Sequence, residues 1–524
     1  MELWEWIPPS AKNIAVLGNL KNDAMELFNR RQPKADFILI PSKGQLTETL
    51  ANNKKTSYDC TICTADFLAN ADLDNLLRMI YKFTSKDGQI IGEFYNSGYL
   101  PNLINAGLGK GNIQIGFGIG EFKQQAAANS LYIDRLEPIY EADMDSVKKL
   151  NEMSALIAAF NSAGNLLEIP NENDFWAQKY RFRLTFKEIT RKISLAYQLG
   201  DSEISARARL IEPNKFAATH PGIFIAEDDI ATSKILVRQR KIYVNSESAL
   251  AEIEAIRKNN GLIIYEIDDL PPMAEEYFAK NNYLDLKGAH AVEVSTPRLA
   301  DYVREFNPNV KVFLNQLAEL PPPRNFYPRD KVTIFMGGIG RDEDALPILP
   351  VLNDAAETYG EKLEFKFVKC IGTFLSLESP HKELIGEGNF VPYELYARTL
   401  QTVDIALLPL LSSRGKLMKS DLKFIEAAAH GAAVIAAPTI YEDSIIDGKT
   451  GFIYHDEAEF KQKLFYLIDH SDFRQQMAKN AYDYVKINRL LSQHYMERVN
   501  FYHECFDNYA NLDKQLEKRL QKFY

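Results

Sequence analysis

A stretch of basic, acidic and small residues near position 420 carries the side chains best suited to chemistry. Ser420 is placed to cap a helix that has Lys423 in its first turn and Glu426 one turn later. Lys419 and Lys423 would present positive charge there, whereas Glu426 offers an acceptor for sugar hydroxyls. A surface helix with an ordinary Lys–Glu pair is the alternative. The continuation Ala427–Pro438, a small-residue helix followed by a glycine and an apolar strand, favours a site anchored in a rigid core.

A glycine-rich loop at residues 336–341 is a second candidate. It follows the apolar run Val332–Met336 and precedes a helix predicted over 343–356. Gly337 and Gly338 would let the backbone approach a ligand, and the helix N-terminus together with Arg341 favours an anion. An ordinary strand-to-helix turn is the alternative.

A third candidate is the pair of adjacent acids Asp268 and Asp269, which end an apolar strand predicted from residue 262 onward. Paired carboxylates at such a place can bind a divalent metal, position an acceptor hydroxyl or act as a base. They can also simply cap the next element.

Strand-like and helix-like segments alternate along most of the chain, which predicts doubly wound parallel sheets. The first strands are predicted at Ile14–Leu17, Phe37–Ile40, Cys60–Cys63 and Gln89–Phe94, and a break at Leu320–Pro323 separates two later units of the same kind. The predicted organisation is an α/β domain at 1–142, a helical connector at 143–204, Rossmann-like domains at 205–323 and 324–490, and C-terminal helices at 491–524. In these last helices Leu512, Leu516 and Leu520 form a stripe that would pack on the body of the protein or contact a membrane surface.

Composition narrows the class of protein. The 524 residues include 61 Lys and Arg against 71 Asp and Glu, and a net charge of -10 argues against nucleic acid as the main partner. Four cysteines form no disulfide framework, and the N-terminal sequence lacks a signal peptide, so we expect a cytoplasmic protein. Cys60 and Cys63 lie on a predicted strand and have no second pair, which is typical of core cysteines rather than zinc ligands.

The C-terminal two thirds of the chain resemble a known family. The run Lys419–Pro438, Tyr441 and Asp447–Phe452 resemble the donor half of family-four-type glycosyltransferases of the GT-B fold. Further segments resemble landmarks of the family's bacterial O-antigen and surface-polysaccharide members, and they occur in the same order. These are Tyr265–Asp269, Ser295–Leu299, Asn315, the loop Gly337–Arg341 and the pattern Asn480–Asn488. The resemblance spans roughly residues 200–505.

The resemblance implies a role for each site residue. Glu426 matches the glutamate that holds the donor ribose, and Arg341 the basic residue that neutralises the diphosphate. Lys419 and Lys423 would assist Arg341. Gly337 and Gly338 would contact phosphate or sugar through the backbone, and Tyr441 would line the donor site. The chain departs from the family at Met418, where the first glutamate of a pair is expected, and at Asp342–Asp344, where a lysine is expected.

The N-terminal domain resembles a class I methyltransferase in its strand ending at Gly18, its Tyr58–Ile62 strand and its turn at Asp87–Gly88. Asn19–Asn22 replaces the glycine-rich loop, however, and Pro41 replaces the acid that would bind ribose. We therefore expect a non-catalytic domain that binds an acceptor or a partner.

The sequence thus predicts a retaining glycosyltransferase that moves a sugar from a nucleotide-sugar to a glycan, lipid-linked glycan or protein. The resemblance implies no obligatory cofactor and no metal. A bifunctional methyltransferase-glycosyltransferase and a non-catalytic glycan-binding scaffold are the alternatives. Peripheral contact with the inner face of the membrane and the oligomeric state stay open.

Overall fold

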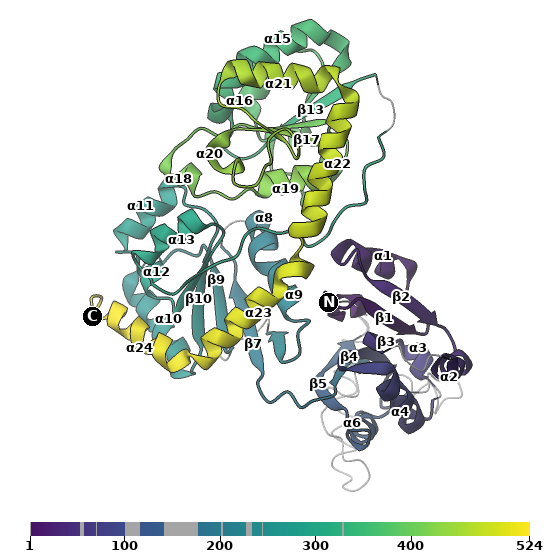
Figure 1. Ribbon diagram of the computed structural model, residues 1–524. Helices are drawn as coiled ribbons and strands as arrows, with labels where there is room; N and C mark the ends of the chain where they lie inside the picture. Colours follow the sequence, from purple (N-terminus) through teal and green to yellow (C-terminus); the bar gives the residue numbers. More distant parts are fainter. Residues whose placement is uncertain are drawn as a thin grey trace, which may run out of the picture. The chain divides into compact units, whose positions relative to one another are not determined.

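The computed structural model describes residues 2–52, 57–69, 71–99, 116–140, 177–200, 203–226, 233–243, 245–326 and 330–524. The chain separates into two compact units, Met1–Lys192 and Ile193–Tyr524. One six-stranded sheet lies in the first unit and two lie in the second, as Figure 1 shows. The predicted α/β fold with parallel, Rossmann-like sheets is confirmed.

The first unit has the strand order β2-β1-β3-β4-β6-β5, in which β6 runs antiparallel to both neighbours. Amphipathic spacing explains its helix α4 (Leu73–Phe83), which buries Leu73, Leu76 and Ile80 and begins where Asp72 accepts a hydrogen bond from the Asn75 amide. The strands are β1 (Asn13–Leu17), β2 (Asp36–Ile40), β3 (Tyr58–Cys63), β4 (Thr84–Tyr95), β5 (Tyr132–Tyr140) and β6 (Ala177–Thr185); the other helices are η1 (Leu3–Trp6), α1 (Asn22–Arg31), α2 (Lys43–Asn52), α3 (Ala65–Leu68) and α6 (Ile119–Ala128).

The helical connector predicted over 143–204 is wrong where the structure describes it. Residues 177–185 form β6 and residues 193–198 form β7, so this segment completes one sheet and begins the next. The charged run Lys187–Ile193 was the basis of the prediction, but it connects the two strands, and Arg181 and Arg183 on β6 are buried against Glu93 and Asp134. Residues 141–176 lie outside the described residues.

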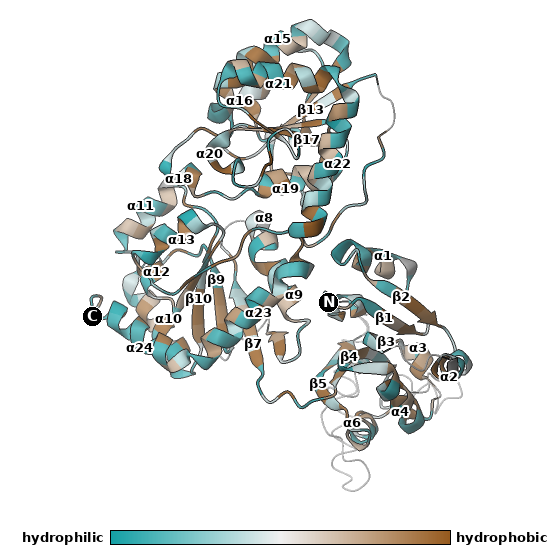
Figure 2. Cartoon of the chain, viewed as in Figure 1, coloured by the Kyte–Doolittle hydropathy of each residue, from teal (hydrophilic) through white to brown (hydrophobic). Residues whose placement is uncertain are grey.

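The first sheet of the second unit is wholly parallel, in the order β12-β11-β10-β9-β7-β8. Figure 2 shows its central strands as strongly hydrophobic, as expected for a sheet covered on both faces. The strands are β7 (Ile193–Gln198), β8 (Ile223–Ile225), β9 (Ile235–Gln239), β10 (Leu262–Ile267), β11 (Ala291–Val294) and β12 (Val310–Val312); the helices are α8 (Glu203–Ala206), η3 (Arg207–Ile211), α9 (Glu212–Ala217), α10 (Ser246–Lys258), α11 (Pro272–Lys280), α12 (Leu284–Lys287) and α13 (Pro297–Arg304).

The second sheet of this unit is also parallel, in the order β15-β14-β13-β16-β17-β18. Its strands are β13 (Val332–Gly337), β14 (Leu363–Val368), β15 (Lys382–Leu384), β16 (Ile405–Leu408), β17 (Ala433–Ala436) and β18 (Phe452–Ile453). The helices are α14 (Asp342–Ala345), η4 (Leu346–Ile348), α15 (Leu349–Tyr359), η5 (Gly360–Lys362), α16 (Ile371–Ser376), η6 (Ile385–Gly388), α17 (Tyr393–Leu400), α18 (Arg414–Leu417), α19 (Leu422–Ala429), α20 (Pro438–Tyr441), α21 (Glu457–Asp469) and α22 (Ser471–Asn488).

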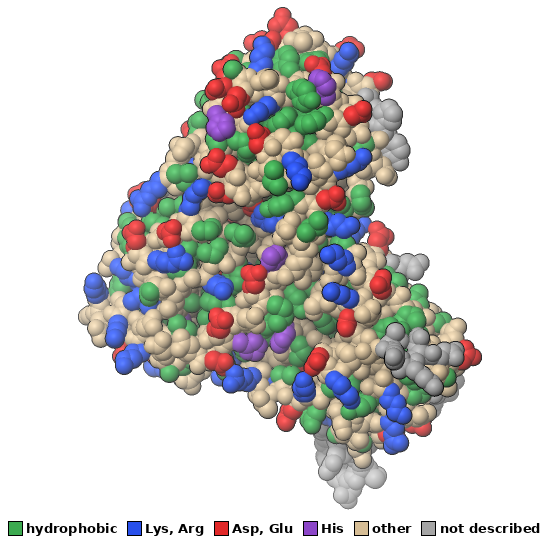
Figure 3. Space-filling view, in the orientation of Figure 1, with side chains coloured by type: hydrophobic (Ala, Val, Ile, Leu, Met, Phe, Trp, Pro, Cys, Tyr) green, Lys and Arg blue, Asp and Glu red, His purple; other side chains and the backbone are tan. Residues whose placement is uncertain are grey.

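The last two helices, α23 (Leu491–Asp507) and α24 (Tyr509–Leu520), return to the first sheet of this unit. Leu512, Leu516 and Leu520 are buried in its core clusters, so the predicted packing on the body is confirmed and membrane contact through this stripe is wrong. Among the residues that the structure describes, none of the helices is long and apolar enough to cross a membrane. Lys and Arg are interspersed with Asp and Glu over the face seen in Figure 3.

Candidate functional site

The glycine loop after β13 holds Arg341 at the carboxyl edge of the second sheet. Gly338 has a φ of +153°, and a Cβ atom there would lie 2.8 Å from Arg341 Cγ. The Gly338 N–H donates to the Val368 carbonyl (3.1 Å), so this amide belongs to the sheet and is not available to a phosphate. At Gly337 a Cβ atom would lie 2.4 Å from the Phe335 ring. In this structure the two glycines make room for neighbouring side chains, and the loop carries Arg341 as its charged group.

The acidic run that follows the loop anchors the site. Asp344 is buried and accepts hydrogen bonds from Arg341 (3.2 Å), Lys416 (2.5 Å) and the Leu411 amide (2.9 Å). Asp342 accepts two from Thr373. Asp342 and Asp344, which stand where the family's lysine is expected, therefore stabilise the loop and do not bind a ligand themselves. Lys416, which was not among the predicted site residues, adds a cation to the same cluster.

The central triad of the site consists of Lys423 and Glu426 on helix α19 and Tyr396 on helix α17. Glu426 is only 6% exposed and accepts hydrogen bonds from Lys423 (3.2 Å) and from the Tyr396 hydroxyl (3.3 Å). Lys423 also donates to the Tyr396 oxygen (3.0 Å). Burial raises the pKa of Tyr396 well above its ordinary value, which keeps its hydroxyl protonated as a donor. An ordinary exposed Lys–Glu pair is thereby excluded for Lys423 and Glu426.

Electrostatics place Arg341, Lys423 and Tyr441 in one neighbourhood. Burial raises the pKa of the Tyr441 phenol, and the positive charges of Arg341 and Lys423 oppose that rise. Burial also raises the pKa of the Cys370 thiol, and the charges of Arg341 and Lys423 partly oppose that rise. Besides the Asp344–Lys416 pair, the carboxyl edge of the second sheet thus gathers Arg341, Lys423, the buried Glu426 carboxylate and two phenols, as an anionic, hydroxyl-bearing ligand requires.

The N-terminus of α19 is held differently from the prediction. Ser420 does not cap the helix, because its hydroxyl accepts a hydrogen bond from the Asn315 amide (2.6 Å), and Asp421 takes the N-cap position. The Asp421 carboxylate pairs with the buried Arg489 through both oxygens (2.5 and 2.7 Å). Arg209 then joins Asn315 (2.9 Å) to the buried Glu266 of the first sheet (2.7 Å). This continuous polar network fixes α19 between the two sheets.

Asp268 and Asp269 lie just beyond β10, where Arg240 bridges them at 3.3 and 3.0 Å. Lys419 of the second sheet's domain completes the group through Asp269 (2.5 Å). Burial and the neighbouring Asp269 charge raise the pKa of Asp268 to about 6. Sequence reasoning missed Arg240, although it directly follows the buried strand β9.

Met418 occupies the place of the expected first glutamate. It is buried in the core cluster of the first sheet, and its carbonyl accepts a hydrogen bond from Thr296 (3.1 Å). Its side chain is therefore a packing residue between the two domains.

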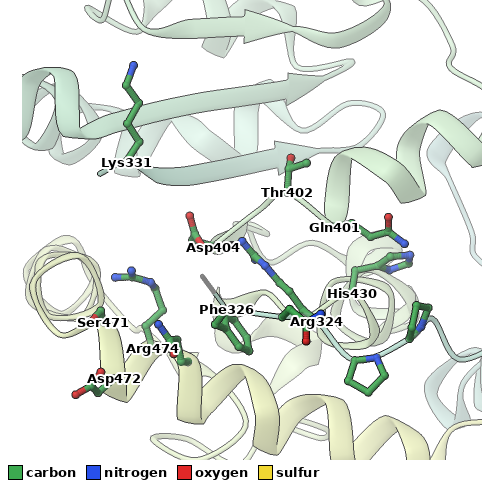
Figure 4. A pocket seen from close by; sticks show the side chains of 14 residues that line it. Arg324, Phe326, Lys331, Gln401, Thr402, Asp404, His430, Ser471, Asp472 and Arg474 are labelled. Atoms are coloured by element: carbon green, nitrogen blue, oxygen red, sulfur yellow. Dashed lines mark hydrogen bonds and ion pairs between the residues drawn. The ribbon is translucent and has the colours of Figure 1, made fainter. Parts of the chain in front are cut away.

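A cavity of about 730 Å³, shown in Figure 4, lies at the edge of the second sheet opposite to Arg341 and Glu426. Lys331 and Asp404 line it from positions just before β13 and β16, so it opens at the amino ends of the strands. Arg324 is tied there to Asp404 (2.8 Å). Ligands of open α/β sheets bind at the carboxyl ends, which favours the Arg341–Glu426 edge as the functional site.

Known proteins are similar to parts of this chain. Residues 357–504 match a family model described as glycosyl transferase-like. The trehalose synthases of Thermococcus litoralis and Pyrococcus furiosus are each 39% identical over 59 residues, which is 11% of this chain and 14% of the relative. The matched segment therefore spans about a seventh of the length of these curated relatives.

Two solved structures illustrate the range of structural similarity. TarM is 13% identical with a TM-score of 0.40, over 51% of this chain and 54% of TarM. Anabaena HepE, solved in complex with UDP and glucose, is 11% identical with a TM-score of 0.42, over 59% of this chain and 99% of HepE. Lys419, Lys423, Glu426 and Tyr441 lie within residues 357–504, the segment that matches the glycosyl transferase-like family model.

Proposed function

We propose that this protein is a glycosyltransferase that moves a sugar from a nucleotide-sugar donor to an acceptor hydroxyl, with retention of configuration at the sugar. One observation carries the proposal: the buried Glu426–Lys423–Tyr396 triad lies at the carboxyl edge of a parallel sheet, within the glycosyl transferase-like segment. A buried carboxylate in this place accepts hydrogen bonds from the vicinal hydroxyls of a ribose.

The cations of the site suit the leaving group. In the reaction, the bond between the sugar's anomeric carbon and the diphosphate oxygen breaks, the acceptor oxygen bonds to that carbon, and the proton of the acceptor hydroxyl passes to the departing diphosphate. The departing nucleoside diphosphate gains negative charge, which Arg341 and Lys423 stabilise. Lys419 binds Asp269 in this structure and would contribute from the acceptor side. The donor would bind without an obligatory metal or other cofactor.

Asp268 and Asp269 would position the acceptor, which is a glycan, a lipid-linked glycan or a protein in the manner of the bacterial surface-polysaccharide enzymes that the chain resembles. Two features support a cytoplasmic location, where nucleotide-sugars are made: the donor class itself and the four cysteines, all of which are free and buried.

The N-terminal unit would be methyltransferase-like and non-catalytic, with a role in binding an acceptor or partner. A Cβ atom at Gly18 would lie 2.1 Å from Thr64 Oγ1, and the Gly18 N–H donates to the Ile40 carbonyl (2.9 Å). Gly18 is therefore enclosed by its own domain at the point where a cofactor loop would have to open. Calorimetry with adenosylmethionine tests this view, and submillimolar binding would revive a bifunctional enzyme.

A thermal-shift screen against UDP, GDP, CMP and ADP and their sugar conjugates tests the donor assignment. A ligand at 100 times its dissociation constant adds about 2.7 kcal/mol of stability. We expect one nucleotide class to stabilise the protein, and we expect Arg341→Ala and Glu426→Ala to remove that shift.

Glu276→Ala is the matched control, because Glu276 forms an exposed ion pair with Lys280 on α11. It should leave the nucleotide shift unchanged. No shift with any nucleotide in the unmodified protein would favour a non-catalytic scaffold instead.

A further inference from the structure

A second, smaller cavity of about 250 Å³ lies at the carboxyl ends of β9 and β10 in the first sheet of the second unit. Gln239, Arg240, Tyr265 and Asp269 line it from the strand ends, and helix α11 covers it. Its volume is below the 300–1,000 Å³ typical of pockets for drug-sized ligands, so it suits a compact group rather than a long chain.

Several buried polar atoms of residues that line this cavity have no hydrogen-bond partner within the part of the chain that the structure describes. They are both amide atoms of Gln239, the Tyr265 hydroxyl and the Ser205 hydroxyl. Leaving such an atom unpaired is costly, and native proteins seldom do so without a ligand or water. The set combines an amide donor, an amide acceptor and two hydroxyls, each of which can donate and accept. A polyhydroxyl compound offers the same mixture, because every hydroxyl does both.

The charges beside the cavity cancel. Arg240 bridges Asp268 and Asp269, and Lys419 pairs with Asp269. Among the described residues of this group, two cations thus face two carboxylates, which leaves no excess of positive charge to attract a phosphate or a carboxylate group. This balance favours a neutral ligand.

The mouth of the cavity is apolar. Met273 and Tyr277, four residues apart on α11, are 68% and 48% exposed. A flat aromatic side chain beside a few fixed polar groups suits a ring with one C–H face and several hydroxyls. A pyranose sugar has both.

We propose that this cavity binds the terminal sugar of the acceptor, and that this sugar is neutral. The inference rests on the proposed glycosyltransferase function and narrows its acceptor to one that ends in an uncharged sugar, as opposed to an amino-acid side chain or an anionic headgroup. Gln239 and Tyr265 hold its hydroxyls, Tyr277 stacks on its ring, and Asp269 faces the hydroxyl that is glycosylated.

Saturation-transfer NMR on the full chain tests the proposal without any donor. The probes are the methyl glycosides of glucose, galactose, mannose and N-acetylglucosamine, with methyl glucuronoside as the anionic comparison. We expect at least one neutral glycoside to bind, the glucuronoside to bind at least tenfold more weakly, and both Gln239→Leu and Tyr277→Ala to weaken binding at least tenfold. Tyr277 is half exposed, so its variant should fold even if the buried Gln239 does not tolerate leucine.

Gln476→Leu, an exposed glutamine on α22 that bonds only to Asn480 among the contacts seen, is the matched control and should not affect glycoside binding. Binding of the nucleotide, read separately by thermal shift, should survive in Tyr277→Ala. Equal binding of the glucuronoside, or unchanged glycoside binding in both pocket variants, would overturn the proposal. If the unmodified protein binds a glycoside but no nucleotide, the glycosyltransferase assignment is refuted instead.

Discussion

Replacing Asp268 by asparagine should stabilise the second unit, and by more as the pH rises. Asp268 lies beside Asp269 in a mostly buried group, and burial is the main reason that its pKa rises from 3.8 to about 6. Asparagine keeps the size of the side chain and remains neutral. The variant therefore avoids placing a second negative charge next to Asp269, and Arg240 still pairs with Asp269.

The magnitude follows from the difference in pKa. A carboxyl whose pKa is higher in the folded than in the unfolded chain favours folding fully below the unfolded pKa, and that contribution is lost as the pH rises through the folded pKa. A rise of about two pKa units corresponds to about 3 kcal/mol. The free energy of unfolding of Asp268→Asn relative to the unmodified protein should thus increase by about 2 kcal/mol between pH 4 and pH 7, out of a full difference of about 3 kcal/mol, and level off above pH 7.

Urea unfolding at four pH values measures this difference. All three tryptophans, Trp4, Trp6 and Trp176, precede residue 192, so their fluorescence follows the first unit, whereas far-UV circular dichroism also follows the second. We expect only the dichroism transition to shift. Asp301→Asn, at an exposed ion pair with Arg304, is the control and should show no such pH dependence. A pH-independent difference for Asp268→Asn would refute the reasoning.

Three further predictions concern packing and reactivity. Arg489→Met leaves the Asp421 carboxylate buried without its ion-pair partner and should lower the free energy of unfolding in urea by about 3–5 kcal/mol. Adding Asp421→Asn should recover part of that loss. A loss below about 1 kcal/mol would show that the pair does not stabilise α19. Gly338→Ala forces a Cβ atom against Arg341 at a positive φ, so the free energy of unfolding should fall by about 1–3 kcal/mol and the nucleotide thermal shift should become smaller. An unchanged stability and an unchanged thermal shift would mean that the loop accommodates the methyl group without strain. Burial raises the pKa of all four cysteine thiols, which belong to Cys60, Cys63, Cys370 and Cys505. A thiol reagent should therefore modify none of them in the native protein and all four in denaturant. Rapid modification of any cysteine in the native protein would show that its thiol is at the surface.

Apolar runs bounded by turns predicted several strands, among them β1, β2 and β3, but they did not predict edge strands such as β15 and β18. Val332–Met336, which forms most of β13, is an example of a correct prediction, because a strand covered on both faces needs an uninterrupted apolar sequence. The same rule failed at β6, where buried Arg181 and Arg183 interrupt the apolar pattern. Their charges are compensated by Glu93 and Asp134, which are distant in the sequence and cannot be paired with them from sequence alone.

The candidate site shows the same limit. Local spacing identified Lys423 and Glu426, which interact within one helical turn. Tyr396, Lys416 and Arg240 reach the site from separate segments, so only the fold reveals them. Ser420 has the side chain of a helix cap, but the distant Asn315 takes its hydroxyl instead.

Release of nucleoside diphosphate from the nucleotide-sugar selected by the thermal-shift screen tests the central claim most directly. A hydrogen bond to a charged group contributes about 1.5–3 kcal/mol, so Glu426→Gln should lower kcat/KM roughly 10- to 150-fold. The fold should be unchanged, since glutamine keeps an oxygen that can accept from Lys423 and Tyr396. The account predicts measurable turnover in the unmodified protein and this loss in the variant, whereas equal turnover in both would contradict it.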